Sequence, residues 1–183
     1  MVISLDVTAP TAAKFNQILT FLMRSRVFQV LTNSPPLYLT YLQQFWDNIS
    51  YNASAQPPVI QTNVNNTEIV FSEADLRTIL SLGTEAQENG PTEFPTAMRS
   101  GALQRMGYVR AMDATQVVKS LVYGQWRYLI YALVTALGAK KGGYDEINVK
   151  LFSGMLSLVY NKPYSFSRYI FEAFVEQITG NPR

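Results

Sequence analysis

The stretch LGAKKGGYDE, residues 137–146, combines two lysines with three glycines, the residue types of a phosphate-binding loop. Such a loop requires G-x-x-x-x-G-K-[ST] between a strand and a helix. The glycine spacing is present, but Tyr144 stands where the lysine belongs, and the preceding segment is predicted to be a helix. The sequence therefore predicts that Gly138 ends this helix, with Lys140 and Lys141 near its negative end.

Paired carboxylates are a second route to chemistry. Glu172 and Glu176 are spaced to share a helix face, and Arg168 precedes them by one turn. This arrangement is typical of a solvated face with a weak ion pair rather than of two acids facing each other across a cleft. Asp145 and Glu146 are adjacent, so on a helix they would point in different directions. Neither pair is predicted to form an active site.

The chain has no cysteine and no histidine. Their absence from the sequence excludes disulfides, zinc sites of the Cys/His type, thiol nucleophiles and every relay that needs an imidazole. We therefore predict that the protein is not an enzyme, and we expect no metal and no cofactor. An enzyme of unfamiliar chemistry would require several buried polar side chains that converge in a cleft.

Charge is unevenly distributed along the chain. Residues 1–96 carry four basic and eight acidic side chains, whereas residues 97–141 carry seven basic side chains against Asp113 alone. Such a segment is expected either to pair with the acidic half of the same fold or to bind nucleic acid or an acidic partner. The candidate contact residues are Arg99, Arg105, Arg110, Lys119, Arg127, Lys140 and Lys141.

Composition favours a well-packed domain, because 48% of the residues are apolar and only 15% are charged. Apolar residues recur at helical spacing over residues 12–31, 36–49, 126–137 and 147–158, and again from Phe166 to the end of the chain. Residues 84–95 form a predicted polar loop. The sequence thus predicts a mainly α, single-domain helical bundle with one small antiparallel β-hairpin.

Three local signals place the elements of the first half. In NSPP, Ser34 is the expected N-cap of helix 36–49, with the prolines in its first turn. The broad apolar stripe of that helix is predicted to be core. Asn65-Asn66 between VIQTNV and TEIVF predicts a tight hairpin turn, since Asn tolerates positive φ. The spacing of Ser72 and Asp75 predicts a capped helix that ends at Gly83.

Further signals concern the second half of the chain. Tyr123 and Trp126 are predicted to lie in the core rather than to stack on bases. Tyr144-Asp145-Glu146 is predicted to open a helix that runs to about residue 160. Gly154 lies inside it, which indicates close approach of a neighbouring helix, since glycine lowers helix propensity by about 1 kcal/mol. Ser165 is the predicted cap of the last helix.

Five segments in collinear order resemble a plant retroelement domain: FQVLTNSPPLY with QQFW, EIVFSEADLRTILSL, LQRMGY, QWRYLIYALVTALGAK and FSRYIFEAFV. That domain is common in daisy-family genomes, in polyproteins of Ty1/copia-type LTR retrotransposons. The resemblance covers about residues 15–178. More remotely, the layout is similar to plant transposon and plant mobile domains. The family offers no catalytic residues to carry over.

The resemblance implies a retrotransposon-derived module that acts through a protein partner or as a homo-oligomer. The alternative is sequence-independent binding of RNA or DNA by the basic segment 97–141. We expect a flexible N-terminal arm over residues 1–14 and one helical domain over 15–180. No secretory signal is visible, and the apolar run at 128–139 is too short to span a bilayer, so an intracellular location, cytoplasmic or nuclear, is expected.

Overall fold

The computed structural model describes residues 16–33, 35–111, 116–137 and 145–180. Helices dominate, and the strands form one three-stranded antiparallel sheet and one two-stranded pair. The prediction of a mainly α fold is thus confirmed. In chain order the helices are α1 (Asn16–Arg24), α2 (Phe28–Thr32), α3 (Leu39–Asn48), α4 (Glu73–Ile79), α5 (Glu85–Glu88), α6 (Thr96–Arg105), α7 (Gly124–Leu137), α8 (Val149–Tyr160) and α9 (Phe166–Ile178), with the short 3-10 helix η2 (Lys119–Leu121).

The two sheets lie in different parts of the chain. The larger sheet has the order β1 (Ser50–Asn52), β2 (Val59–Val64) and β3 (Thr67–Phe71), with each strand antiparallel to its neighbour. The predicted hairpin is its β2–β3 half. The second sheet pairs β4 (Gln116–Val118) with β5 (Glu146–Asn148). Because Glu146 belongs to β5, the predicted helix does not open at Tyr144-Asp145-Glu146 but at Val149.

The main hydrophobic core lies among α1, α2, α6, α7 and α8. Helix α7 has the expected buried face, and α8 is buried over most of its length. A Cβ on Gly154 would lie 2.9 Å from the Phe166 ring and 3.1 Å from the Tyr164 ring. The close approach predicted at Gly154 is therefore present, although aromatic side chains at the start of α9 make it.

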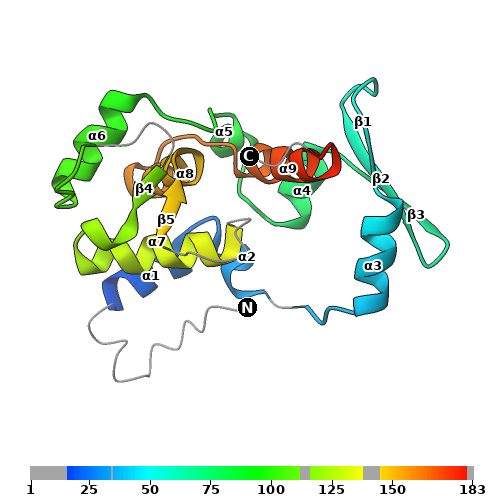
Figure 1. The fold of residues 1–183 in the computed structure, drawn as a ribbon, viewed down its shortest axis with the longest axis horizontal. Helices are drawn as coiled ribbons and strands as arrows, with labels where there is room; N and C mark the ends of the chain where they lie inside the picture. The colour runs from blue at the N-terminus through cyan, green and yellow to red at the C-terminus, as the bar shows by residue number, and fades with distance from the viewer. Residues whose placement is uncertain (1–15, 34, 112–115, 138–144, 181–183) are drawn as a thin grey trace.

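A second hydrophobic cluster joins the larger sheet to α4 and α9 through Ile60, Phe71, Leu76 and Phe171. Figure 1 shows the three strands and α3 at the right-hand end of the molecule, with α6 and α7 at the opposite end. Helix α9 contributes Phe166 and Tyr169 to the main core and Phe171 to the second cluster. It therefore holds the sheet end to the helical body.

Several predicted helix ends are confirmed by their caps. Ser72 and Asp75 form a reciprocal capping box at α4, and the Ser165 side chain accepts from the Arg168 backbone N–H at α9. Helix α4 ends at Ile79 rather than at Gly83, so that predicted boundary was wrong. Residues 84–95 are not wholly a loop, because they include α5 with its own capping box.

The predicted first turn of α3 was also wrong. The helix begins at Leu39 with Tyr38 as its N-cap, so Pro35 and Pro36 precede the helix instead of opening it. The proposed cap, Ser34, lies outside the described residues. Helix 12–31 is likewise divided, because a turn at residues 25–27 separates α1 from α2.

The N-terminal arm predicted over residues 1–14 lies outside the described residues, and the single domain over 15–180 stays a prediction. No helix within the described ranges has both the length and the apolar character needed to cross a bilayer.

Candidate functional site

Four described members of the predicted basic set, Arg99, Arg105, Lys119 and Arg127, contact different parts of the fold. Arg99 is 3% exposed and pairs with Glu93, and it also donates to Thr96 Oγ1 at 3.3 Å. Its guanidinium therefore belongs to the start of α6, and this side chain is not available to a partner. For Arg99, the alternative that the basic segment pairs with acidic residues of the same fold is therefore the correct one.

Three other described cations of the segment contact neighbouring groups of the fold. Arg105 donates to the Tyr160 hydroxyl at 2.8 Å and lies over that ring, while Arg127 Nε donates to the Val122 carbonyl at 2.7 Å. Lys119 Nζ lies 5.2 Å from the centre of the Tyr131 ring. Arg110 is exposed, and Lys140 and Lys141 lie outside the described residues together with Gly138.

The candidate carboxylates take part in structural contacts. Glu172 pairs with Lys150 at 2.6 Å, while Arg168 pairs with Glu73 at 3.3 Å rather than with its own helix. Asp145 accepts from the backbone N–H and the hydroxyl of Ser120, so it ties the start of β5 to η2. Among the described residues, no group of three or more acidic side chains is placed to hold a metal ion.

A buried ion pair that the sequence did not reveal lies at the turn between α1 and α2. Arg26 Nη1 is 3.2 Å from Glu88 Oε1, and the two side chains are 9% and 1% exposed. Arg26 also donates to the Gln87 carbonyl at 2.5 Å and to Ser157 Oγ at 3.1 Å, and its guanidinium lies over the Phe166 ring. One arginine thus connects the α1–α2 turn, α5, α8 and α9.

Hydrogen bonds complete the surroundings of the Glu88 carboxylate. Its second oxygen accepts from the Ser167 backbone N–H at 2.8 Å. Burial raises the pKa of Glu88, although the Ser167 hydrogen bond and the Arg26 charge oppose that shift. Burial likewise lowers the pKa of Arg26. Buried charges of this kind are stable only while each keeps its partner, so the network is first of all structural.

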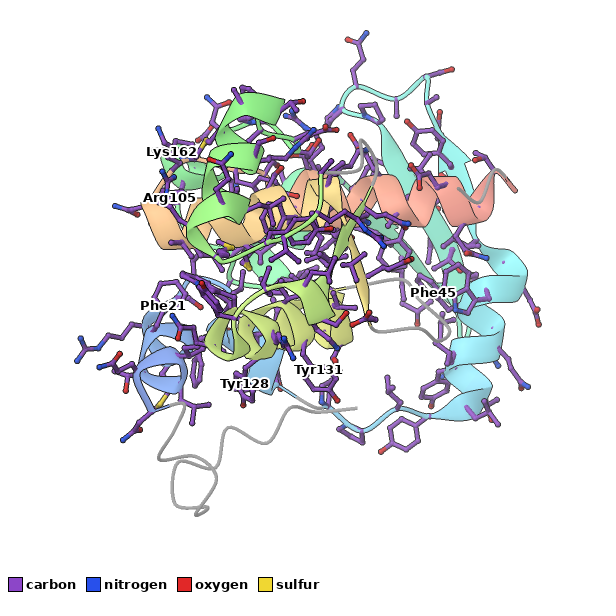
Figure 2. The ribbon with its side chains drawn as sticks, turned by 60° about the vertical axis from the view of Figure 1, so that its left-hand side comes forward. Phe21, Phe45, Arg105, Tyr128, Tyr131 and Lys162 are labelled. Atoms are coloured by element: carbon purple, nitrogen blue, oxygen red, sulfur yellow. The ribbon has the colours of Figure 1, made fainter. Side chains whose placement is uncertain are left out.

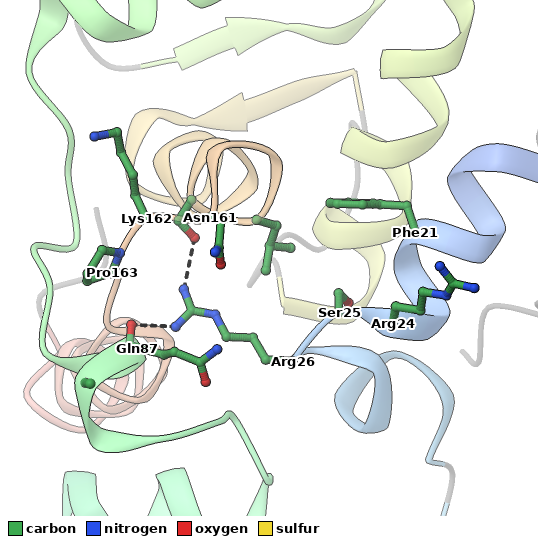
Figure 3. Close-up of a pocket in the computed structure, with 11 residues that line it drawn as sticks. Phe21, Arg24, Ser25, Arg26, Gln87, Asn161, Lys162 and Pro163 are labelled. Atoms are coloured by element: carbon green, nitrogen blue, oxygen red, sulfur yellow. Dashed lines mark hydrogen bonds between the residues drawn. The ribbon is translucent and has the colours of Figure 1, made fainter.

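A cavity of about 460 Å³ lies beside this arginine. Its lining includes three cations, Arg24, Arg26 and Lys162, together with Phe21 and Asn161. Figure 3 shows the Arg26 guanidinium held between Ser157 and Gln87, while the Arg24 and Lys162 side chains extend away from it. The cavity therefore has a basic rim, but its cations do not converge on one point.

Helix α3 carries the largest departure from the predicted core. None of its residues is buried, and Trp46 is 41% exposed. The exposed large apolar side chains on this helix and the two residues before it define what we call the α3 surface: Leu37, Tyr38, Leu39, Tyr41, Leu42 and Trp46. The prediction that the whole stripe is core was therefore wrong.

The reason lies in how little of the fold covers α3. Thr62 Oγ1 donates to the Phe45 carbonyl at 2.9 Å, so the helix rests on β2. Phe45 packs edge-on against Phe174 of α9, and Figure 2 shows Phe45 on the side of α3 that faces the body of the molecule. The sheet and α9 cover only the C-terminal part of the helix, where Phe45 is packed and where Trp46 also stacks on Phe174, with 6.1 Å between the ring centres. The apolar side chains from Leu37 to Leu42 are left exposed, and Trp46 is partly exposed.

The sequence also placed Tyr123 in the core, whereas it is 62% exposed. Its ring covers Gly107, where a Cβ would lie 2.4 Å from the ring. Trp126, in contrast, is half-buried and packs against the main core, as expected.

In comparisons with known proteins, no family model, no curated protein and no solved structure matches this chain.

Proposed function

We propose that the protein is a non-enzymatic, plant retrotransposon-derived module that acts inside the cell through protein contacts or self-association. The retroelement part of this proposal rests on the collinear resemblance over residues 15–178. The interaction part rests on one structural observation, the α3 surface. Soluble monomers rarely expose contiguous large apolar patches, and such patches are typical of interaction sites.

The composition of the α3 surface supports this function. From Leu37 to Ile49 the only charged residue is Asp47, and the segment contains three aromatic residues besides Phe45. Aromatic residues are enriched in protein interfaces and charged residues are depleted from their centres. A helix whose apolar residues extend beyond the face covered by its own fold requires a second covering surface.

The test removes the apolar character of the α3 surface without disturbing the packed side of the helix. Leu39→Lys combined with Leu42→Glu changes two exposed side chains, and Ile79→Lys is the control because Ile79 is equally exposed on α4. We expect wild-type protein and the control to self-associate as concentration rises in sedimentation velocity. The double variant should remain monomeric.

Trp46 provides a second readout. The chain has two tryptophans, so Trp126→Phe leaves Trp46 as the only one. If the α3 surface becomes covered, Trp46 emission should shift to shorter wavelength as the protein is concentrated. Emission that does not depend on concentration, with identical sedimentation of wild type and double variant, would show that this surface does not mediate self-association.

A second candidate function, sequence-independent binding of RNA or single-stranded DNA, is favoured by the basic rim of the cavity. The exposed rim cations Arg24 and Lys162 lie outside the segment that the sequence singled out, whereas Arg26 is paired with Glu88. Arg105 approaches the same region, because it contacts Tyr160, two residues before Lys162. Figure 2 shows Arg105 and Lys162 on the same side of the molecule.

Fluorescence anisotropy with labelled RNA and single-stranded DNA tests this candidate. Phosphate contacts make binding weaken steeply as salt rises. Arg24→Gln with Lys162→Gln should then lower affinity at low salt. Lys150→Gln, at the opposite end of α8 and paired with Glu172, should not. Binding absent at low salt, or insensitive to these changes, excludes the candidate.

A further inference from the structure

The open edge of β3 is the most exposed part of the larger sheet. Among the described strands, β3 is the last in the order β1-β2-β3 and pairs with β2 alone. Four of its five residues are exposed, including Ile69 and Val70. An exposed strand edge presents unpaired N–H and C=O groups to any second strand, and proteins usually protect it with charges, proline or a bulge. Here the only charge is Glu68.

The hairpin geometry fixes which backbone groups are free. Asn65 and Asn66 have φ of 52° and 59°, as in a two-residue type I′ turn. Such a turn closes on a hydrogen-bonded pair, here Val64 with Thr67. Hydrogen-bonded and non-hydrogen-bonded pairs then alternate along an antiparallel ladder. The pairs Asn63–Glu68 and Gln61–Val70 are therefore non-hydrogen-bonded pairs.

One contact confirms this alternation independently. The Asn63 carbonyl accepts from Asn48 Nδ2 at 3.0 Å, so it points toward the β1 side and away from β3. Since Asn63 faces Glu68 in a non-hydrogen-bonded pair, the Glu68 peptide groups point the opposite way, out from the open edge. The same holds for Val70 two residues later.

These free groups are complementary to themselves. If two β3 strands lie antiparallel with Ile69 opposite Ile69, each Glu68 faces a Val70, and the outward N–H and C=O groups form about four backbone hydrogen bonds. We propose that the open edge of β3 pairs in this way with β3 of a second copy of the chain. The two three-stranded sheets become one continuous sheet, with a two-fold axis at Ile69.

Other two-fold registers are disfavoured by residues on the same edge. Centring the axis on Glu68 places two carboxylates directly opposite each other, which is destabilising. Centring it on Val70 requires the Ser72 N–H, which already donates to Asp75 Oδ2 at 2.8 Å in the α4 capping box. The Ile69 register places the two Glu68 residues diagonally, with their backbones about 7–8 Å apart by strand geometry.

The same register brings exposed apolar side chains together. Ile69 lies opposite Thr62, whose hydroxyl contacts α3, so Ile69 is on the face of the sheet that carries α3. Across the axis it packs against Ile69 of the second copy, with the two α3 helices on the same face. This inference rests on the proposed function, because it names a second copy of the chain as the partner in self-association. The contact it uses is the β3 edge and not the α3 surface.

Cross-linking tests the register directly, because the chain contains no cysteine. In a non-hydrogen-bonded antiparallel pair the Cα atoms are about 4.5 Å apart, within the range of a disulfide. Ile69→Cys should therefore form a disulfide-linked dimer under mild oxidation at least about tenfold faster than Ile79→Cys, whose thiols meet only by collision. Val70→Cys should cross-link more slowly than Ile69→Cys.

A second variant tests the backbone contact without a thiol. Val70→Pro removes an N–H that points out of the sheet, so the pairing of β3 with β2 is retained and an edge position tolerates the proline. We expect self-association to weaken at least about tenfold in sedimentation equilibrium. Circular dichroism and urea unfolding of the monomer verify that the variant is folded.

The outcomes separate this inference from the proposed function. If Ile69→Cys cross-links no faster than Ile79→Cys, edge pairing is overturned, even if the α3 double variant abolishes association. If edge pairing is found and the α3 double variant associates like wild type, the α3 proposal fails and the edge stands. Association of wild type that Val70→Pro leaves unchanged also overturns edge pairing.

Discussion

Arg26 and Glu88 form an ion pair across 62 residues of sequence, with 3.2 Å between Nη1 and Oε1 and almost no solvent access. Removal of one member leaves the other charge buried and unpaired, which typically costs about 3–5 kcal/mol. We therefore predict that Arg26→Ala and Glu88→Ala each lower the free energy of urea unfolding by about that amount.

The exposed pair Arg168–Glu73 is the control for this comparison. Its side chains are 47% and 37% exposed, and such pairs contribute at most about 1 kcal/mol. Arg168→Ala should thus have a small effect. If Arg26→Ala proved no more destabilising than Arg168→Ala, the network at the α1–α2 turn would not be structural.

Titration of Glu88 should make the free energy of unfolding depend on pH. Burial raises the pKa of this carboxyl, so the folded protein holds its proton more tightly than the unfolded chain does. The stabilisation from protonation is fully present below the unfolded pKa of about 4.3, and it is lost as pH rises through the higher folded pKa. Glu88→Gln removes this titration.

Urea unfolding of wild type and Glu88→Gln from pH 4 to 7 measures the effect. The stability of wild type relative to the variant should fall as pH rises. Asp75 acts in the opposite sense, because its hydrogen bonds with Ser72 lower its pKa, but it is present in both proteins and cancels in the difference. A difference that is constant or that grows with pH contradicts the prediction.

Gly154 and Gly101 should respond oppositely to alanine. A Cβ on Gly154 would meet the Phe166 ring at 2.9 Å, whereas a Cβ on Gly101 has no neighbouring atom within 4 Å. Gly101→Ala in α6 should stabilise by about 0.5–1 kcal/mol through helix propensity. Gly154→Ala should lose about 1–3 kcal/mol to overpacking despite the same gain. Thermal unfolding of both variants distinguishes packing from propensity.

Local signals allowed the sequence to predict the hairpin and two of the helix caps. Asn65 and Asn66 adopt positive φ as expected, and the Ser72 and Ser165 caps depend only on residues within three positions. Where the partner is distant, the same reasoning fails. Nothing in a polar segment around Glu88 indicates that its carboxylate is buried against Arg26.

The α3 surface shows why burial itself was harder to predict. Periodicity shows that two ridges of the helix are apolar, but it does not show how much of the fold is available to cover them. The sheet and Phe174 cover Phe45 near the end of the helix, and Trp46 stacks on the same Phe174 ring, whereas Tyr41, one turn before Phe45, is 45% exposed. The exposure of Tyr38 and Leu42 depends on the absence of a further layer among the described elements, which no local pattern encodes.

A comparison of Arg99 with Arg110 distinguishes a structural arginine from one that is exposed to a binding partner. Its guanidinium pairs with Glu93 and Thr96, and its Nε has no hydrogen-bond partner among the described residues. We predict that Arg99→Gln destabilises the protein by about 1.5–3 kcal/mol, because it removes the charge-assisted hydrogen bond of a buried guanidinium, although its partner Glu93 is 44% exposed. Arg110→Gln, at an exposed position, should change stability by less than about 0.5 kcal/mol. If RNA binds, the order should reverse for affinity measured below the unfolding transition, with Arg110→Gln weakening binding and Arg99→Gln leaving it unchanged. If the Arg99→Gln variant had wild-type stability and reduced RNA affinity, Arg99 would be a binding residue and not a structural one.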